Sequence, residues 1–371
     1  MQQADVAIAG AGIIGLSAAL ELASAGLRVV VFERGQAMRE CSWAAAGMLA
    51  ASDPENPAAL LPLSYLGLSL YSEFLTKVEY LSGQRVPIRT TQTLLEARTI
   101  PVGSEQLSDG AIHAFGSGLR SNGHKFFLLQ EQSLDPRDLV RSLPQAARAV
   151  GVTILEQSTV TSITNQLNSV QIQTTTGEWA ATHFNNACGA WGSDLGGIPI
   201  TPRKGQMLLV ETPEHLTAVI RTPDLYLVPR GNGRIVVGAT VENAGFDKRI
   251  DPAAIAALHR AAAELWPPIA GARIIDTWAG LRPATTDFLP VIGPAIDIDE
   301  GNGARGSSPE LHSLDLHSPD PHSWLALGHY RNGILLAPGT ARLLRQLILK
   351  EPAGIDAAAY SASRFIASAT Q

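Results

Sequence analysis

The sequence predicts an α/β fold of two domains, one built around a parallel sheet and the other rich in antiparallel strands. Three observations support this prediction. The 371-residue chain exceeds the usual size of one domain. A glycine-rich strand–helix–strand pattern occupies its N-terminal part, and a strand, a turn and a helix lie near its C-terminus. Most segments between them alternate in the manner of strands, so we expect a β-rich domain inserted into the first domain.

The first expected element is a short apolar strand, Asp5–Ala9, which runs into a glycine-rich turn and an alanine- and leucine-rich helix. Gly10 permits the tight turn, Gly12 lets the backbone approach a pyrophosphate, and Gly15 lets the helix pack closely on the strand. The N-terminus of such a helix presents free N–H groups and the positive end of its dipole to phosphates.

A second expected strand, Arg28–Phe32, ends at Glu33, where a carboxylate can accept hydrogen bonds from ribose hydroxyls. An ordinary strand–helix turn with incidental glycines would explain the glycine triplet but not this acid. Strand, glycines, helix, strand and acid in this order therefore predict a Rossmann-like dinucleotide-binding unit.

Composition argues against several classes of protein. The apolar fraction of 45% and the charged fraction of 17% are typical of a globular chain with a substantial core. A net charge of −6 without basic clusters argues against a nucleic-acid partner. Cys41 and Cys188 are the only cysteines, so the chain has no disulfide framework, and their spacing is not that of a Cys-x-x-Cys metal site.

The apolar N-terminal segment lacks a basic region and is interrupted by glycines and Glu21. We therefore expect neither a signal peptide nor a membrane span, and a cytoplasmic location.

Residues 41–48, Cys-Ser-Trp-Ala-Ala-Ala-Gly-Met, are mostly too small to form a good core face. Such a segment suits a place where backbone lies against a flat ligand. The alternative is a helix packed tightly against its neighbours, and the residues alone leave both open.

The following segments carry clear signals of helix and strand. In order, we expect an amphipathic helix at 65–81, a strand at 91–97, a helix with Asp135 as N-cap and Pro136 at its first position that ends at Gly151, a strand at 152–163, and a hairpin over 170–186 that turns at Thr176-Gly177. A turn of small residues follows at 187–191.

The remaining expected elements are a hairpin over 225–239 around Asn232-Gly233, a strand at 272–279 that leads into the turn Gly280–Pro283, an exposed loop at 296–323, a strand at 324–327, the turn 328–333 and a helix to Leu349. The exposed loop contains His312, His317 and His322, whose spacing places them on no common helical face, so we expect no metal site there.

Three polar side chains stand out as candidates for binding. Arg282 and Arg331 each lie in an expected glycine-flanked turn after an apolar strand, where a guanidinium can form a bidentate pair with a carboxylate. A structural ion pair is the alternative for both, and it is the favoured interpretation for Arg331. Tyr226 opens a hairpin and could place a hydroxyl over a cleft, although most strand tyrosines serve packing. No Ser–His–acid or paired-carboxylate motif is present, so a cofactor must supply most of the chemistry.

Four segments together resemble the glycine oxidase group of the D-amino acid oxidase superfamily of flavin amine oxidases. They are GAGIIG with Glu33, CSWAAAGML, TWAGLRPATTDFLPVIGP and GHYRNGILLAPGTARLL. The last two are specific to this group. The resemblance covers residues 4 to 350 and implies a Rossmann-like FAD-binding domain of the glutathione-reductase type, with an inserted β-rich substrate domain of mixed or antiparallel sheet plus helices.

The resemblance implies a noncovalent FAD and names the residues that would hold it. The ADP half would lie on Gly10, Gly12, Ile13, Ile14, Gly15, Glu33 and Arg34, with Val160 near the adenine. Ser42, Ala45, Ala46, Gly47 and Met48 would lie along the flavin ring, and Arg331, Asn332, Gly333, Ile334 and Leu335 would approach its pyrimidine end. Cys41 lies near this segment, but the resemblance gives no reason for a covalent link to it.

The resemblance also implies the reaction and its catalytic residues. Arg282 would bind the substrate carboxylate, Tyr226 would add a hydrogen bond, and Arg331 would lie near the substrate. The expected reaction oxidises glycine, sarcosine or a small D-amino acid with dioxygen, in connection with the thiazole of thiamine. Asp224 and Val241 replace residue types found in some relatives, which leaves the amine preference open.

Other interpretations remain open at this point. A flavin dehydrogenase that passes electrons to a quinone or a protein is the main alternative, ahead of a nicotinamide-dependent dehydrogenase and a non-catalytic flavoprotein. The sequence is compatible with a homo-oligomer but does not fix the oligomeric state. We expect an FAD-binding domain at residues 1–85, 150–200 and 275–371, and a substrate-binding domain at 86–149 and 201–274.

Overall fold

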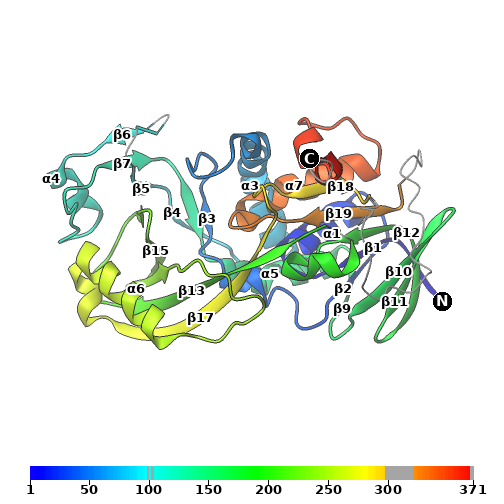
Figure 1. Ribbon diagram of the computed structural model, residues 1–371, viewed down its shortest axis with the longest axis horizontal. Coiled ribbons are helices and arrows are strands. Elements are labelled where there is room, and N and C mark those ends of the chain that lie inside the picture. Colours follow the sequence, from blue (N-terminus) through cyan, green and yellow to red (C-terminus); the bar gives the residue numbers. More distant parts are fainter. Residues whose placement is uncertain (98–99, 102–103, 197, 297–320, 368–371) are drawn as a thin grey trace.

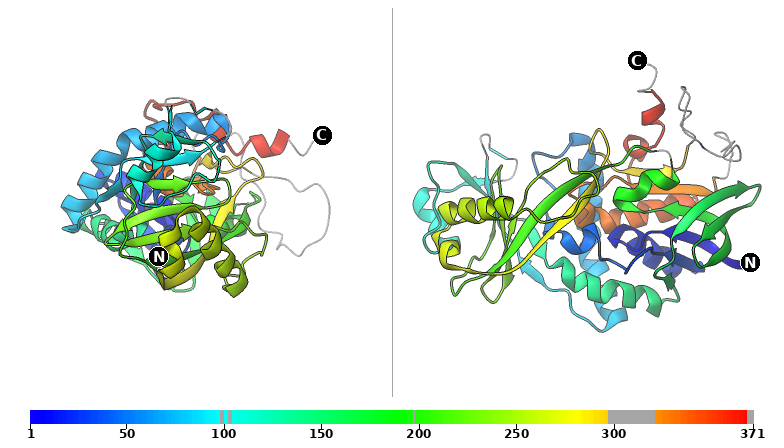
Figure 2. Two further views of the ribbon diagram at one scale, coloured as in Figure 1. Left: turned by 90° about the vertical axis from the view of Figure 1, so that its left-hand side faces the viewer. Right: turned by 60° about the horizontal axis from the view of Figure 1, so that its bottom comes forward.

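The computed structural model describes residues 1–97, 100–101, 104–196, 198–296 and 321–367 (Figure 1). Two eight-stranded sheets form its two lobes, and a three-stranded sheet completes the fold. Figure 2 shows the same two lobes from other directions, with the N-terminus in the lobe of the first sheet. The mixed α/β class is therefore confirmed.

The first sheet has a parallel core. Strand order is β10-β11-β12-β1-β2-β9, and β19 pairs with both β12 and β18. The strands are β1 (Gln2–Ala9), β2 (Val29–Phe32), β9 (Thr153–Leu155), β10 (Val160–Gln166), β11 (Ser169–Thr174), β12 (Gly177–Asn186), β18 (Val291–Pro294) and β19 (Ser323–Leu327). β9, β2, β1, β12 and β19 pair in parallel, as a Rossmann-like sheet requires.

Four helices pack together on this sheet: α1 (Ile13–Ser24), α3 (Leu61–Ser82), α5 (Pro136–Ala149) and α7 (Gly333–Ile348). The expected cap is present, since Asp135 accepts a hydrogen bond from the Arg137 N–H at 3.0 Å. Tyr71 ties α3 to α7 by donating its hydroxyl to the Ile334 carbonyl at 2.8 Å. The apolar faces of these helices form the largest core of the protein.

One stretch of the described chain, Ala58–Ser82, is long and apolar enough by composition to cross a membrane. It comprises a short 3₁₀ turn, η1 (Ala58–Leu60), and α3. About 39% of its most apolar window is buried inside the protein, where α3 packs on α5 and α7. A core helix of this length passes the same test of composition.

The second sheet is antiparallel except for one parallel pair, β14 with β5. Its order is β17 (Arg273–Ala284), β13 (Thr201–Glu211), β16 (Arg234–Gly238), β15 (Tyr226–Gly231), β14 (Val219–Arg221), β5 (Thr93–Glu96), β7 (Phe126–Leu129) and β6 (Glu105–Gln106). Helix α6 (Pro252–Leu265) and the 3₁₀ turn η4 (Pro267–Gly271) pack against it and bury Trp266.

Several smaller elements complete the fold. The third sheet has the order β3 (Met48–Leu49), β8 (Gln132–Leu134) and β4 (Ile88–Thr90). The short helices are α2 (Cys41–Ala44), α4 (Asp109–Ile112) and α8 (Arg364–Ala367), and the remaining 3₁₀ turns are η2 (His113–Phe115), η3 (Gly189–Leu195) and η5 (Ala358–Tyr360).

Two expectations about local structure are wrong. Residues 152–163 form two strands, β9 and β10, because the chain turns between them at Gln157, which has φ +56°. Arg282 lies inside β17 and not in a turn, because β13 pairs with β17 as far as Ala284 and continues the strand past Gly280. The hairpin at Asn232-Gly233 is confirmed, with positive φ at both residues.

We keep the expected domain division as a proposal, with two adjustments that the contacts favour. Helix α5 packs on α1 and α3 and belongs with the first sheet, whereas β17 is an edge strand of the second sheet. Most of the exposed loop expected at 296–323, with His312 and His317, lies outside the described residues.

Candidate active site

The turn between β1 and α1 leaves no room for side chains at two of its glycines. Gly10 has φ +101°, and a Cβ there would lie 2.5 Å from the Ala187 carbonyl oxygen. A Cβ on Gly15 would lie 2.0 Å from the Gly10 carbonyl oxygen. Gly12 is the N-cap residue of α1 and has no side chain to bond the first N–H groups, so the helix dipole faces the space in front of the turn.

Glu33 closes this turn from the end of β2. Its Oε2 accepts a hydrogen bond from the Ala11 N–H at 2.9 Å, and its Oε1 accepts one from the Gly35 N–H, also at 2.9 Å. These bonds fix the carboxylate beside the glycine turn, where it can accept further hydrogen bonds from the hydroxyls of a ligand.

The segment of small residues after Cys41 is held from both lobes. Ser42 Oγ accepts a hydrogen bond from the Ile13 N–H at 2.9 Å, which ties the segment to α1. Trp278 Nε1 on β17 donates to the Ala44 carbonyl at 3.0 Å. A Cβ on Gly280 would lie 2.6 Å from Ala44 Cβ, so β17 crosses the segment in direct contact. Only residues 41–44 are helical, and Ala45 directly after them is extended.

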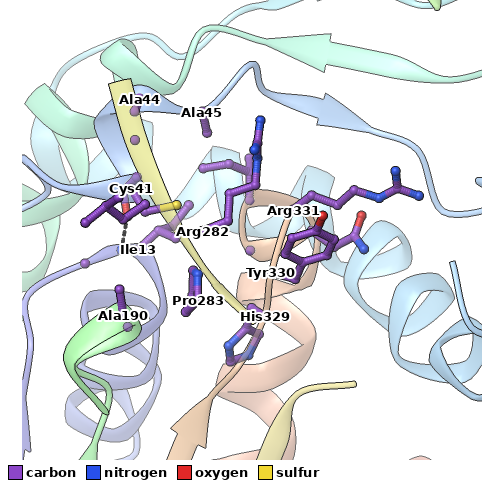
Figure 3. A pocket seen from close by; sticks show the side chains of 18 of the residues that line it. Ile13, Cys41, Ala44, Ala45, Ala190, Arg282, Pro283, His329, Tyr330 and Arg331 are labelled. Atoms are coloured by element: carbon purple, nitrogen blue, oxygen red, sulfur yellow. Dashed lines mark hydrogen bonds between the residues drawn. The ribbon is translucent and has the colours of Figure 1, made fainter. Parts of the chain in front are cut away.

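These elements surround one cavity of about 450 Å³ that reaches from the glycine turn into the second lobe. All the predicted site residues line it except Gly15 and Leu335. Figure 3 shows Arg282 and Arg331 with Cys41, Ala44 and His329 around this space. The structure thus brings together residues from both lobes that lie far apart in the sequence.

Among the described residues, four arginines line this cavity. Three of the four form ion pairs with carboxylates. Arg34 pairs with Glu40 at 3.1 Å. Arg331 pairs with Asp53 at 3.3 Å and also with Glu55. Buried Arg221 lies 3.5 Å from Asp53 and 3.5 Å from Glu131.

Arg282 differs from the other three because no carboxylate among the described residues forms an ion pair with it. Its guanidinium lies over β13, where a Cβ on Gly205 would be 2.3 Å from Nη2. Nη1 donates a hydrogen bond to the Thr240 carbonyl at 3.2 Å. Its partners, the Thr240 carbonyl and the Tyr226 hydroxyl, are both neutral. Such a half-buried cation is suited to bind an anionic group that enters the cavity.

Tyr226 stands beside this arginine. Its ring lies against Gly238 on β16, and its hydroxyl donates to Met207 Sδ at 3.2 Å. Burial raises the pKa of the Tyr226 hydroxyl, and the positive charge of Arg282 opposes that shift. The hydroxyl is therefore neutral at pH 7 and can donate a hydrogen bond to the same anion.

Arg331 forms the structural ion pair that its sequence context favours. Burial lowers the pKa of its guanidinium, but the attraction of Asp53 and the hydrogen bond to Glu55 outweigh burial, and the net pKa is raised. Asp53 also pairs with Arg221, so one carboxylate interacts with two arginines that line the cavity. Burial raises the pKa of Glu131, opposed by Arg221.

Three uncharged titratable side chains complete the cavity wall. Burial lowers the pKa of His329 to about 3, and its Nε2 is hydrogen-bonded to Thr340 Oγ1 at 3.0 Å. Burial raises the pKa of the Cys41 thiol to about 11 and that of Cys188 to about 12. All three are therefore neutral at pH 7. Within the described ranges, no group of three or more His, Cys, Asp or Glu residues could hold a metal ion.

Comparison with known proteins identifies the family. The model of the FAD-dependent oxidoreductase (DAO) family matches residues 5–347. The chain belongs to this family. The residues of the glycine turn, Glu33 and the small-residue wall fit its cofactor, because they leave room for a phosphate-bearing, flat group between α1 and β17.

The relatives of this FAD-dependent oxidoreductase include enzymes of two lengths. It is 35% identical to the bifunctional protein ThiO/ThiG of Nostoc sp. over 94% of this chain and 53% of that protein. It therefore spans about half the length of that relative. It is 30% identical to the glycine oxidase of Pseudomonas putida over 96% of this chain and 98% of that one. The crystal structure of glycine oxidase from Geobacillus kaustophilus superimposes with a TM-score of 0.87 at 27% identity, covering 98% of this chain and 99% of that one.

Sequence reasoning missed several residues of the cavity of this FAD-dependent oxidoreductase. Trp191 and His329 lie in the turns at 187–191 and 328–333, which the sequence predicts from its small residues. Both could therefore have been proposed as residues that line the cavity. Asp53 and Arg221 carried no such signal, because their importance comes only from the ion pairs that the fold creates.

Proposed function

We propose that the protein catalyses the FAD-dependent oxidative deamination of glycine, with sarcosine and small D-amino acids as further substrates. The products are a 2-oxo acid (glyoxylate from glycine), ammonia (methylamine from sarcosine) and hydrogen peroxide, with dioxygen as electron acceptor. The observation that carries this proposal is Arg282, which lines the cavity of this FAD-dependent oxidoreductase and has no carboxylate partner among the described residues. The glycine oxidases among its relatives support it.

The proposed roles follow from the charges in the cavity. Arg282 binds the substrate carboxylate as a bidentate pair, and Tyr226 donates a second hydrogen bond to it. Together they orient the amine and its Cα–H, and such orientation is worth several kcal/mol, up to about 7–11, in favourable cases. Arg331 shapes the end of the cavity near the substrate while its charge is satisfied by Asp53 and Glu55.

We propose that FAD is bound without a covalent link. The ADP half would lie on Gly10, Gly12, Gly15, Glu33 and Arg34, with Ile13, Ile14 and Val160 beside it; Ser42, Ala45, Ala46, Gly47 and Met48 would line the flavin ring, and Asn332, Gly333, Ile334 and Leu335 would approach its pyrimidine end. Cys41 is protonated at pH 7, which does not favour it as an attacking nucleophile. When bound, FAD accepts two electrons from the amine and returns them to dioxygen.

We assign none of the described residues to the removal of the Cα proton. His329 is neutral, but its Nε2 is engaged by Thr340, and the carboxylates Asp53 and Glu55 are paired with Arg331. The amine must instead lose its own proton to the solvent before it reacts. Water then hydrolyses the imine product to the 2-oxo acid and ammonia.

We further propose a role in forming the thiazole of thiamine, supported by the fused ThiO/ThiG proteins among the relatives. A homo-oligomer and a cytoplasmic location remain predictions from the sequence.

Anaerobic addition of glycine to the purified protein tests the proposal. Glycine should bleach the flavin absorbance bands, and air should restore them with one hydrogen peroxide formed per amine oxidised. A dehydrogenase that uses a quinone or protein acceptor would bleach but would give little peroxide. Absence of bleaching by any small amine would refute the proposed reaction.

A further inference from the structure

Three residues that contact one another form a wall at the end of the cavity proposed for the nucleotide. Arg34, Glu40 and Trp191 all line the cavity there. The guanidinium carbon of Arg34 lies 3.4 Å from the centroid of the Trp191 ring, a close cation–π contact. The same guanidinium pairs with Glu40 at 3.1 Å. Arg34 follows Glu33 directly, so this wall stands beside the carboxylate at the proposed ribose position.

Two side chains of one segment of the second lobe support this wall from outside the cavity. Residues 241–249, here called the strap, follow β16. The Phe246 ring stacks on the Trp191 ring, with centroids 5.3 Å apart and an interplanar angle of 26°. Lys248 Nζ lies 2.8 Å from Glu40 Oε2. Neither Phe246 nor Lys248 lines the cavity, so both act on it through wall residues.

The two ends of the strap are fixed to β13. Lys204 and Glu242 exchange backbone hydrogen bonds at 3.0 and 2.9 Å. The buried Lys204 ammonium donates to the Arg249 carbonyl at 2.6 Å, and the Asp251 N–H donates to Gln206 Oε1 at 2.7 Å. The strap is therefore anchored in one lobe and makes its outer contacts with the other.

The exposure of Phe246 is consistent with a role at the wall and not in a core. Phe246 is 53% exposed. A large apolar residue in such a position contributes little stability unless its ring contacts a specific partner. Trp191 is that partner. Lys248 is likewise 44% exposed and reaches Glu40 across the boundary between the lobes.

We infer that the strap retains FAD by holding the Arg34–Trp191–Glu40 wall against the nucleotide half of the cofactor. Departure of FAD requires this wall to move, and movement of the wall breaks the Phe246–Trp191 stack and the Lys248–Glu40 pair. Because these contacts act when the cofactor leaves, they slow dissociation more than they speed association. This inference depends on the cofactor of the family and is independent of which amine is oxidised.

FAD release from the holoenzyme after dilution, followed by the recovery of flavin fluorescence, tests the inference. Phe246→Ala should release FAD about 2- to 10-fold faster, the range that one aromatic pair provides. Phe246→Tyr keeps the stack and should release FAD at the wild-type rate. Lys248→Ala should accelerate release by about 2-fold or more at low salt and less at high salt, because an exposed ion pair is screened.

Arg234→Ala provides a matched control and should release FAD at the wild-type rate. Arg234 forms an exposed ion pair with Glu211 at 3.2 Å on the second sheet, and neither residue lines the cavity. Unchanged release from Phe246→Ala, or equal acceleration by Phe246→Ala and Phe246→Tyr, would overturn the inference. So would a lower Tm of the apoprotein with an unchanged release rate, because the strap would then support only folding. Release is measured without any amine, so failure of glycine oxidation leaves this result intact.

Discussion

Replacing Arg282 with alanine tests the proposed substrate site directly. The change removes the only cavity arginine that lacks a carboxylate partner among the described residues, while Arg34, Arg221 and Arg331 keep theirs. It also leaves the Thr240 carbonyl without its donor. The fold should survive, because Arg282 is half-buried and forms no ion pair with any residue that the structure describes.

The expected loss can be worked out from the contacts. Removing one partner of a buried charge pair costs about 2–5 kcal/mol, which corresponds to a 30- to 5,000-fold decrease in kcat/KM. Arg282 is only partly buried, and Tyr226 can still donate to the carboxylate, so we expect the lower part of this range, about 30- to 300-fold. Arg282→Lys keeps the charge but loses the planar fork and should lie between alanine and wild type.

Anaerobic stopped-flow measurement of flavin reduction by glycine gives both the apparent affinity and the limiting rate. The alanine variant should need far more glycine and should be reduced more slowly. Arg273→Ala is the control, because Arg273 lies on the same strand β17 and forms an exposed ion pair with Glu211 at 2.6 Å. If Arg282→Ala is reduced by glycine as readily as this control, the role assigned to Arg282 is wrong.

Other predictions concern the hydroxyl, the cofactor turn and two titrations. Tyr226→Phe removes one hydrogen bond to the substrate, which costs about 1 kcal/mol of binding free energy. Steady-state assays should therefore show a KM for glycine that is several-fold higher and a kcat that changes little. Gly10→Val should abolish flavin content, read from the absorbance of purified protein, since its Cβ would lie 2.5 Å from the Ala187 carbonyl. kcat/KM should rise with pH through the pKa of the substrate ammonium, and a flat profile would contradict reaction of the neutral amine. His329 has a pKa of about 3 in the folded chain against 6.5 in the unfolded chain. Because the unfolded chain binds this proton first, the free energy of unfolding should fall as pH drops below 6.5, by at most about 1.4 kcal/mol per unit. Chemical denaturation of His329→Gln should show a shallower dependence.

Local sequence signals predicted the parts of the fold that local chemistry determines. Gly10 and Glu33 mark the nucleotide turn because only certain residues fit that turn. Asp135 marks a helix start because its side chain bonds a backbone N–H that would otherwise be free. The hairpin at Asn232-Gly233 was equally accessible, since its turn requires two residues with positive φ.

Features that depend on residues far away in the sequence, such as strand pairing and ion pairs, could not be predicted in the same way. The alternating residues 152–163 resemble one strand, yet β9 and β10 pair with different neighbours, β2 and β11, so the chain must turn between them. Arg282 was assigned to a turn because its glycine neighbours suggested one, whereas β13 extends the strand. The charges of the cavity are a further case. An arginine forms an ion pair only if the fold brings a carboxylate to it, and that carboxylate can be far away in the sequence. Asp53 and Arg331, which form such a pair, are 278 positions apart.

The carboxylate of Asp53 has a consequence for attempts to alter the specificity of this cavity. Since it pairs with both Arg331 and Arg221, exchanging either arginine changes the electrostatic requirement of the other. Energies of substitutions at these three positions should therefore be strongly non-additive. An engineer who wishes to reshape this end of the binding site must redesign positions 53, 221 and 331 as a unit.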